Sequence, residues 1–200
     1  MLRTISWDQG PQRAGARRRF PPRRLHLVDI ENLAGDSRPS LSQVREALGL
    51  YADCLAFGAM DQVEVASSHL TLLNAALGWP YAHYRVRSGP DGADLALLDV
   101  LRHENVANRF THVAIGSGDH LFAEEAAYLA ARDVWVTVVS RRRSLSSQLA
   151  QAAHQVIFLD TARLRLPNSP LFPKRSLVPL PADRPPARGG RFPVVSLISK

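Results

Sequence analysis

Leu25-His26-Leu27-Val28-Asp29-Ile30 is an aliphatic run of strand length that carries a carboxyl group near its end. Further β-like runs follow at 62–66, 81–87, 112–115, 134–139 and 156–159. Helical patterns lie between them, first after an N-cap at Ser40 and then over 69–77, 93–106, 121–131 and 145–153. This alternation predicts parallel strands joined by crossover helices on both faces. We therefore expect a single-domain α/β fold with a doubly wound, mainly parallel sheet.

The charge is divided unevenly along the chain. Residues 1–24 hold seven Arg against one Asp, and residues 161–200 hold eight Lys or Arg against one Asp, whereas residues 25–160 carry a net charge of −6. Eleven of the fourteen prolines also lie in the two end segments, which disfavours regular structure there. We expect a basic disordered tail at 1–24, a folded domain at 25–160 and a Pro/Arg-rich tail at 161–200. Such tails suit a polyanionic partner, or they are solvated ends with no partner.

Several classes of protein are disfavoured by composition. Charged or polar residues interrupt every apolar run before it reaches the roughly 20 residues needed to span a bilayer, so no membrane partner is expected. The N-terminal arginines are not followed by the apolar segment of a secretory signal. Cys54 is the single cysteine, which suits a core residue in a reducing cytoplasm. We therefore expect a cytoplasmic protein.

Carboxyl groups occur where the predicted strands end and the helices start. Asp29 ends the first strand, and Asp119 follows the fourth strand in Ile115-Gly116-Ser117-Gly118-Asp119. Asp94 starts the helix at 93–106, with Asp91 in the turn before it and Asp99 one and a half turns after it. Each acid alone has an ordinary explanation as a helix cap or turn residue. Together they predict a ligand site beyond the carboxyl ends of the strands.

A cluster of carboxylates needs a cation. Two carboxylates about 5 Å apart repel by roughly 3 kcal/mol at an effective dielectric near 20. Oxygen ligands without clustered histidine or cysteine favour Mg²⁺ or Mn²⁺, with Asp29, Asp94 and Asp119 as the ligands. Such an ion activates water and neutralises charge on a phosphodiester. Asn32 is a candidate to orient a carboxylate or water, and Ser117 is a candidate to bond a ligand or phosphate oxygen.

Three consecutive arginines, Arg141, Arg142 and Arg143, follow the fifth predicted strand and should emerge at the same edge as the carboxylates. Cations at that place would hold a nucleic-acid backbone without reading its sequence. The alternative is a solvated loop before a helix. We interpret the three arginines as a substrate-binding segment.

Three segments resemble the motifs of the NYN domain, a branch of the PIN-like nucleases, over most of 25–160. The first motif of the family resembles Val28-Asp29-Ile30-Glu31-Asn32. Its central motif, at the start of a helix, resembles Gly92-Ala93-Asp94-Leu95-Ala96-Leu97, and Asp99 stands at the place of a further acid of the family. Its third motif resembles Ser117-Gly118-Asp119-His120-Leu121-Phe122. The resemblance implies a PIN-like fold, dependence on a divalent metal and hydrolysis of RNA phosphodiester bonds, with endonucleolytic or other cleavage left open. Leu121 stands where the family commonly has a second aspartate.

The departure at Leu121 keeps a second hypothesis open, a catalytically weak or inactive PIN-like module that binds RNA or acts as a scaffold. A nucleotide-binding α/β protein is a weaker alternative, because Gly116-x-Gly118 follows a strand but no third glycine completes the fingerprint. A serine hydrolase is disfavoured, since Ser117 is not in a Gly-x-Ser-x-Gly elbow. The sequence leaves a homodimer open.

Overall fold

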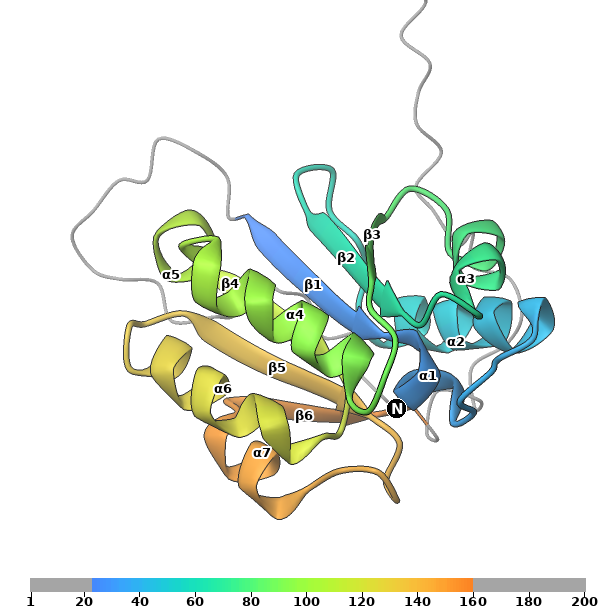
Figure 1. The fold of residues 1–200 in the computed structure, drawn as a ribbon. Helices are drawn as coiled ribbons and strands as arrows, with labels where there is room; N and C mark the ends of the chain where they lie inside the picture. The colour runs from blue at the N-terminus through green and yellow to red at the C-terminus, as the bar shows by residue number, and fades with distance from the viewer. Residues whose placement is uncertain (1–22, 160–200) are drawn as a thin grey trace, which may run out of the picture.

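The computed structural model describes residues 23–159, and its strands form one parallel sheet in the order β3-β2-β1-β4-β5-β6 (Figure 1). The strands are β1 Arg24–Asp29, β2 Gln62–Ser67, β3 His83–Val86, β4 His112–Gly116, β5 Trp135–Ser140 and β6 Gln155–Phe158. This arrangement confirms the predicted single-domain α/β fold with a doubly wound sheet, and every strand in it is parallel to its neighbours. The two predicted tails lie outside the described residues, apart from Arg23 and Arg24 at the start of β1.

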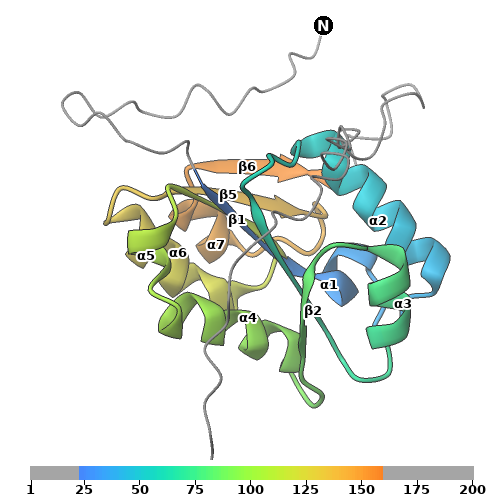
Figure 2. The same cartoon turned by 90° about the horizontal axis from the view of Figure 1, so that it is seen from above.

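Helices cover both faces of the sheet (Figures 1 and 2). One face is covered by α1 Ile30–Ala34, α2 Leu41–Cys54 and α3 Leu72–Gly78. The other face is covered by α4 Gly92–His103, α5 Val106–Arg109, the 3₁₀ helix η2 His120–Phe122, α6 Ala123–Ala130 and α7 Ser147–Ala152. Within the described residues, no helix is long and apolar enough to cross a membrane.

The two hydrophobic cores follow from the two-residue period of the strands. In β1, Leu25 and Leu27 belong to the core under α4 to α7, whereas Val28 belongs to the core under α2 and α3. Asp29 is next in the alternation, so its side chain begins on the face that α4 covers. The sequence period of β1 thus sets which helix the Asp29 carboxyl group can meet.

Several helix boundaries differ from the predicted ones. The helix predicted over 93–106 ends at His103, because Asn105 adopts a left-handed conformation with φ 52° before α5 begins. The helix predicted over 121–131 starts as the 3₁₀ turn η2, and those predicted over 69–77 and 145–153 begin at Leu72 and Ser147. The short helix α1 was not predicted. At Ser40, by contrast, the structure has the predicted N-cap, with a capping box completed by Gln43.

The chain order across the sheet changes direction between β1 and β4. From β1 the chain builds outward to β2 and β3, then crosses back through α4 to β4 and builds outward again to β5 and β6. The segments that leave β1 and β4 therefore diverge to opposite faces, and ligands of open α/β sheets commonly bind beyond the carboxyl ends of two such strands. Asp29 and Asp119 lie in these two segments.

Candidate functional site

Asp29 is both the last residue of β1 and the N-cap of α1. Its Oδ1 accepts hydrogen bonds from the backbone N–H of Glu31 at 3.0 Å and of Asn32 at 3.2 Å. The side chain is only 4% exposed, so the carboxyl group is nearly removed from water. Asp29 therefore ends a buried strand and starts a helix at the switch point of the sheet, and its other oxygen is left available to a neighbour on the same face.

Asp94 lies in the first turn of α4 and is 8% exposed. The turn before it is tight, since Asp91 has a left-handed φ of 53° and a Cβ on Gly92 would overlap the carbonyl oxygen of Arg87. Glycine at position 92 therefore lets α4 start close to the end of β3. One carboxyl oxygen of Asp94, Oδ1, is buried and has no hydrogen-bond partner.

Asp29 and Asp94 form a coupled pair of buried carboxyl groups. Burial raises the pKa of Asp29 to about 6, against the backbone hydrogen bond from Asn32 that lowers it. Burial, together with the negative charge of Asp29, raises the pKa of Asp94 to about 8. The two side chains lie close enough for each to shift the pKa of the other. Near neutral pH the pair thus shares protons, because like charges this close do not both ionise without compensation.

Asp119 follows the carboxyl end of β4 and is the N-cap of η2. Its Oδ1 accepts from the backbone N–H of Leu121 at 2.9 Å and contacts His120 Nδ1 at 2.9 Å. The Asp119 side chain is 29% exposed, and its charge contributes to the raised pKa of Asp94. The three predicted acids therefore interact at one edge of the sheet, and Asp119 is the most exposed of them.

Ser117, Gly118 and Asn32 connect the β4 loop to α1. Asn32 Oδ1 accepts from the Gly118 N–H at 3.2 Å, and the buried Ser117 Oγ accepts from the Asp119 N–H at 3.2 Å. A Cβ on Gly118 would overlap the carbonyl group of Ser144, so only glycine fits there without movement. Asn32 and Ser117 thus hold the backbone that carries Asp119.

The other predicted site residues lie further from the carboxylate pair. Asp91 is exposed at the turn before α4, and its charge adds to the raised pKa of Asp94. Asp99 is exposed, and its Oδ2 accepts from Arg87 Nη1 at 3.4 Å. Five residues after Asp94 on a helix correspond to a rotation of about 140°, so Asp99 does not share its face. The structure therefore brings Asp91 near the pair and leaves Asp99 on the surface of α4.

The three arginines after β5 differ in their surroundings. Arg141 donates from Nε to the Leu33 carbonyl at 2.7 Å and from Nη2 to the Ala34 carbonyl at 2.9 Å, so its guanidinium caps the C-terminus of α1. The guanidinium of Arg142 lies 4.2 Å from the centre of the Phe158 ring. Arg143 is exposed. The segment emerges at the predicted edge, with Arg142 and Arg143 as its exposed members.

Glu31 and Arg141 have roles at this edge that the sequence did not reveal. Glu31 Oε1 accepts from the Ser68 N–H at 2.9 Å and from Thr71 Oγ1 at 2.8 Å, which ties α1 to the segment after β2. The one available signal for α1 was Gly35, six residues after Asp29, because an acid N-cap followed by glycine is typical of a short helix. Gly35 has a left-handed φ of 71° and ends α1.

The donor atoms of the site suit a hard divalent cation. Within residues 23–159, no three Asp, Glu, His or Cys side chains are grouped so as to hold an ion as they stand. Asp29 and Asp94 nevertheless present buried carboxyl oxygens whose charge is uncompensated, and Oδ1 of Asp94 lacks any partner. Mg²⁺ commonly uses one or two carboxylates and keeps several waters. The residues present therefore fit Mg²⁺ or Mn²⁺, with Asp29 and Asp94 as the inner pair and Asp119 as the third acid.

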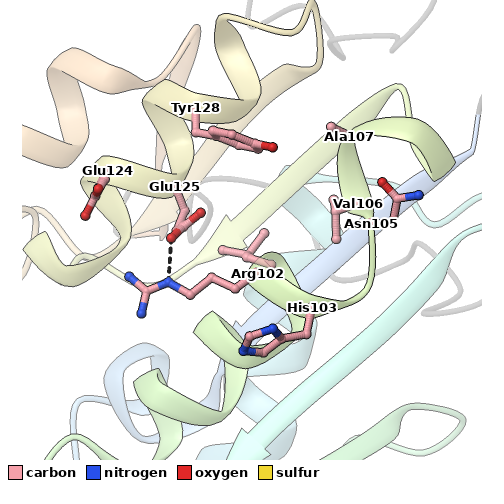
Figure 3. Close-up of a pocket in the computed structure, with 9 residues that line it drawn as sticks. Arg102, His103, Asn105, Val106, Ala107, Glu124, Glu125 and Tyr128 are labelled. Atoms are coloured by element: carbon pink, nitrogen blue, oxygen red, sulfur yellow. Dashed lines mark hydrogen bonds and ion pairs between the residues drawn. The ribbon is translucent and has the colours of Figure 1, made fainter.

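A groove of about 440 Å³ lies elsewhere, between α4, α5 and α6 (Figure 3). Its lining mixes apolar and charged side chains, and Arg102 Nε donates to Glu125 Oε1 at 2.6 Å within it. Leu101, which also lines the groove, is about 10 Å along the helix axis from Asp94. The groove is thus separate from the carboxylate pair, and Arg102 and Glu125 within it form an ion pair. We place the candidate site at the sheet edge.

Comparison with known proteins supports the fold alone. A crystal structure of a protein of unknown function from Vibrio parahaemolyticus RIMD 2210633 superposes with a TM-score of 0.50 at 17% identity, over 70% of this chain and 94% of that one. No family model matches the chain, and no curated protein matches it. The fold and the site together define an α/β domain with a group of acidic residues at its topological switch point.

Proposed function

We propose that the chain is a divalent-metal-dependent ribonuclease that hydrolyses phosphodiester bonds at the Asp29, Asp94 and Asp119 site. The observation that carries the proposal is the buried carboxyl pair with an unpartnered oxygen on Asp94. Such a pair is unfavourable unless a cation compensates it, and structural acids rarely remain in that state. The resemblance of three segments to NYN motifs supports RNA as the substrate.

A Mg²⁺ or Mn²⁺ ion bound by these acids would supply a positive charge for the phosphoryl oxygens and activation of water at neutral pH. The residues of the chain itself hold these acids in place. The backbone N–H groups of Glu31 and Asn32 hold Asp29, and the bonds of Asn32 and Ser117 hold the loop of Asp119. The exposed Arg142 and Arg143 would contact the RNA backbone. Cys54 suits the reducing cytoplasm in which we propose the enzyme acts.

A catalytically inactive RNA-binding module is the second candidate, and Leu121 is the observation that favours it. Leu121 is partly buried and packs against the hydrophobic core, where the NYN motif commonly has a further aspartate. The site thus has one carboxylate fewer for an ion. The two candidates differ in turnover, whereas both predict RNA binding that weakens as salt concentration rises.

The test is cleavage of a labelled single-stranded RNA by the full chain with Mn²⁺, with Mg²⁺ or with EDTA. We expect products only with a divalent ion, and a loss of at least 100-fold in rate for Asp29→Asn and for Asp119→Asn. Asp133→Asn is the matched control, since Asp133 is exposed near the start of β5, at the opposite edge of the sheet. Equal cleavage by wild type and both site variants would show contamination or another site. Salt-sensitive binding without any cleavage would favour the inactive module.

A further inference from the structure

The segment from Val65 to Tyr84 contains no Asp, Glu, Lys or Arg. In a chain that is 22% charged, twenty residues would on average include about four such side chains. The segment covers the end of β2, all of α3 and the start of β3. An uncharged stretch of this length is expected in a buried element, but α3 lies at the rim of the molecule in both ribbon views (Figures 1 and 2).

The outer side of α3 exposes a stripe of leucines. Leu70 is 70% exposed, Leu73 is 69% exposed and Leu77 is 56% exposed. Leu73 and Leu77 are four residues apart and lie on one side of the helix, and Leu70 lies in the turn just before it, while Ala75 on the other side of the helix is fully buried. We call Leu70, Leu73 and Leu77 the α3 face. Tyr81, which is 90% exposed, follows the end of the helix.

The α3 face is held rigidly on the domain. Asn74 Nδ2 donates to the Pro39 carbonyl at 3.0 Å, and Tyr84 Oη donates to the Trp79 carbonyl at 2.6 Å. Gly78 packs so closely on α2 that a Cβ there would overlap the side chain of Val44. Because the helix is fixed at its middle and at its end, the leucines present a preformed apolar surface.

We propose that the α3 face is the contact between two copies of this chain in a symmetric homodimer. The three leucines and Tyr81 expose on the order of 550 Å², which is most of the about 800 Å² that each partner buries in a standard interface. An exposed apolar area of this order lies at the upper end of the roughly 300 to 600 Å² that the largest apolar patch of a typical monomer has, and such patches are often functional. Identical leucine stripes complement each other across a two-fold axis, because each copy offers the same ridge of side chains.

The absence of charge on the α3 face favours a second copy over other partners. Nucleic acid or an anionic membrane would be bound by cations, and 65–84 has no Lys or Arg. The Arg-rich end segments of this chain would be attracted by carboxylates, which the same range also lacks. Two copies of a chain with net charge +7 repel each other overall. A contact through an uncharged surface avoids bringing like charges together.

The dimer contact would also lie near the carboxyl group of Asp29. The α3 face begins just after the carboxyl end of β2, and Thr71 beside it donates to Glu31 at 2.8 Å, two residues from Asp29. The inference does not depend on nuclease activity, because it rests only on the surface of α3.

The experiment is sedimentation velocity of the full chain over a wide concentration range. We expect the mass to rise from 22.1 kDa toward twice that value, and the variant L73E/L77E to stay at 22.1 kDa. Both positions are exposed, so the variant should keep its melting temperature. Met60→Glu is the matched control, since Met60 is 55% exposed outside α3, and it should still dimerise. A wild-type chain at 22.1 kDa throughout, or a dimer that L73E/L77E leaves intact, would overturn the proposal.

A second arm tests the symmetry of the contact. L73K/L77K alone should be monomeric, because it brings like charges together, as L73E/L77E does. Mixing the two variants should restore a dimer, since each Glu pair then faces a Lys pair. If both variants are monomeric and the mixture remains monomeric, the α3 faces do not oppose each other and the proposed two-fold contact is wrong.

Discussion

Residue 94 places a carboxyl group beside a second buried carboxyl group, with one of its oxygens unpartnered. In a protein selected only for stability, an apolar or amide side chain at this position would be more favourable. The acid is therefore best explained by a ligand that compensates its charge. This inference concerns one side chain, so a conservative substitution of that side chain can test it.

Asp94→Asn should stabilise the metal-free protein. The substitution keeps the shape of the side chain but removes a charge that burial and Asp29 both disfavour. We expect the free energy of unfolding at pH 8 in EDTA to rise by on the order of 1 to 3 kcal/mol, measured by urea denaturation. Asp133→Asn should change it by less than about 0.5 kcal/mol. A decrease in stability for Asp94→Asn would contradict the assignment of an uncompensated charge.

Leu121→Asp should increase the affinity of the site for Mn²⁺. The new carboxylate would lie within η2, two residues after Asp119, at the cost of apolar packing against the core. We expect roughly tenfold tighter binding, or about 1.4 kcal/mol, together with a loss of about 1 to 2 kcal/mol of stability. Leu121→Asn, which lacks the charge, separates the two effects. An unchanged Mn²⁺ affinity in Leu121→Asp would mean that position 121 does not face the ion.

At the scale of elements, the strands were predictable and the short helices were not. All the predicted strands are present, because buried parallel strands are continuous apolar runs that the sequence displays directly. Helix α1 has five residues and no helical period, and it is formed by the Asp29 cap and by Arg141 from a distant part of the chain. The break at Asn105 depends on one left-handed residue within an otherwise helical pattern. Such features depend on tertiary contacts or on a single backbone angle.

Substitutions of Arg141 and Arg143 should distinguish a structural role from an RNA-binding role. Arg141→Ala removes two hydrogen bonds to the C-terminal carbonyls of α1, so we expect a loss of about 2 kcal/mol of stability and a displaced Asp29. Arg143→Ala should leave the melting temperature unchanged and weaken RNA binding, with a smaller dependence on salt. Thermal denaturation and RNA titrations at two salt concentrations measure both effects. An unchanged melting temperature for Arg141→Ala would show that its cap is unimportant.

For the molecule as a whole, topology brings the acids together. The sequence predicted that Asp29, Asp94 and Asp119 meet at one edge, since the carboxyl ends of parallel strands share an edge. It did not predict that Asp29 and Asp94 are the coupled pair, or that Asn32 and Ser117 bond the backbone of the Asp119 loop. Those details depend on the angle at which α4 starts and on the close approach at Gly92 and Gly118. Distances between side chains of different segments are not encoded in spacing along the chain.

The raised pKa values also predict how global stability changes with pH. Asp29 and Asp94 hold protons in the folded chain at pH values where the unfolded chain has released them. Their contribution is fully present below about pH 4 and is lost as the pH rises toward about 8, because unfolding then releases protons. Without divalent ions, the free energy of unfolding should fall over this range by on the order of a few kcal/mol in wild type and by less in Asp94→Asn. Equal pH dependence in the two proteins would contradict the coupled pair.

The most direct test of the site is Mn²⁺ binding measured by isothermal titration calorimetry at pH 7.5, with wild type and Asp94→Asn compared. Because Asp94→Asn is expected to be at least as stable as wild type, lost binding cannot be attributed to unfolding. We predict saturable binding to wild type and at least tenfold weaker binding to Asp94→Asn. Absence of binding to wild type, or equal affinity in the two proteins, would contradict the assignment of the buried carboxyl pair as a divalent-metal site.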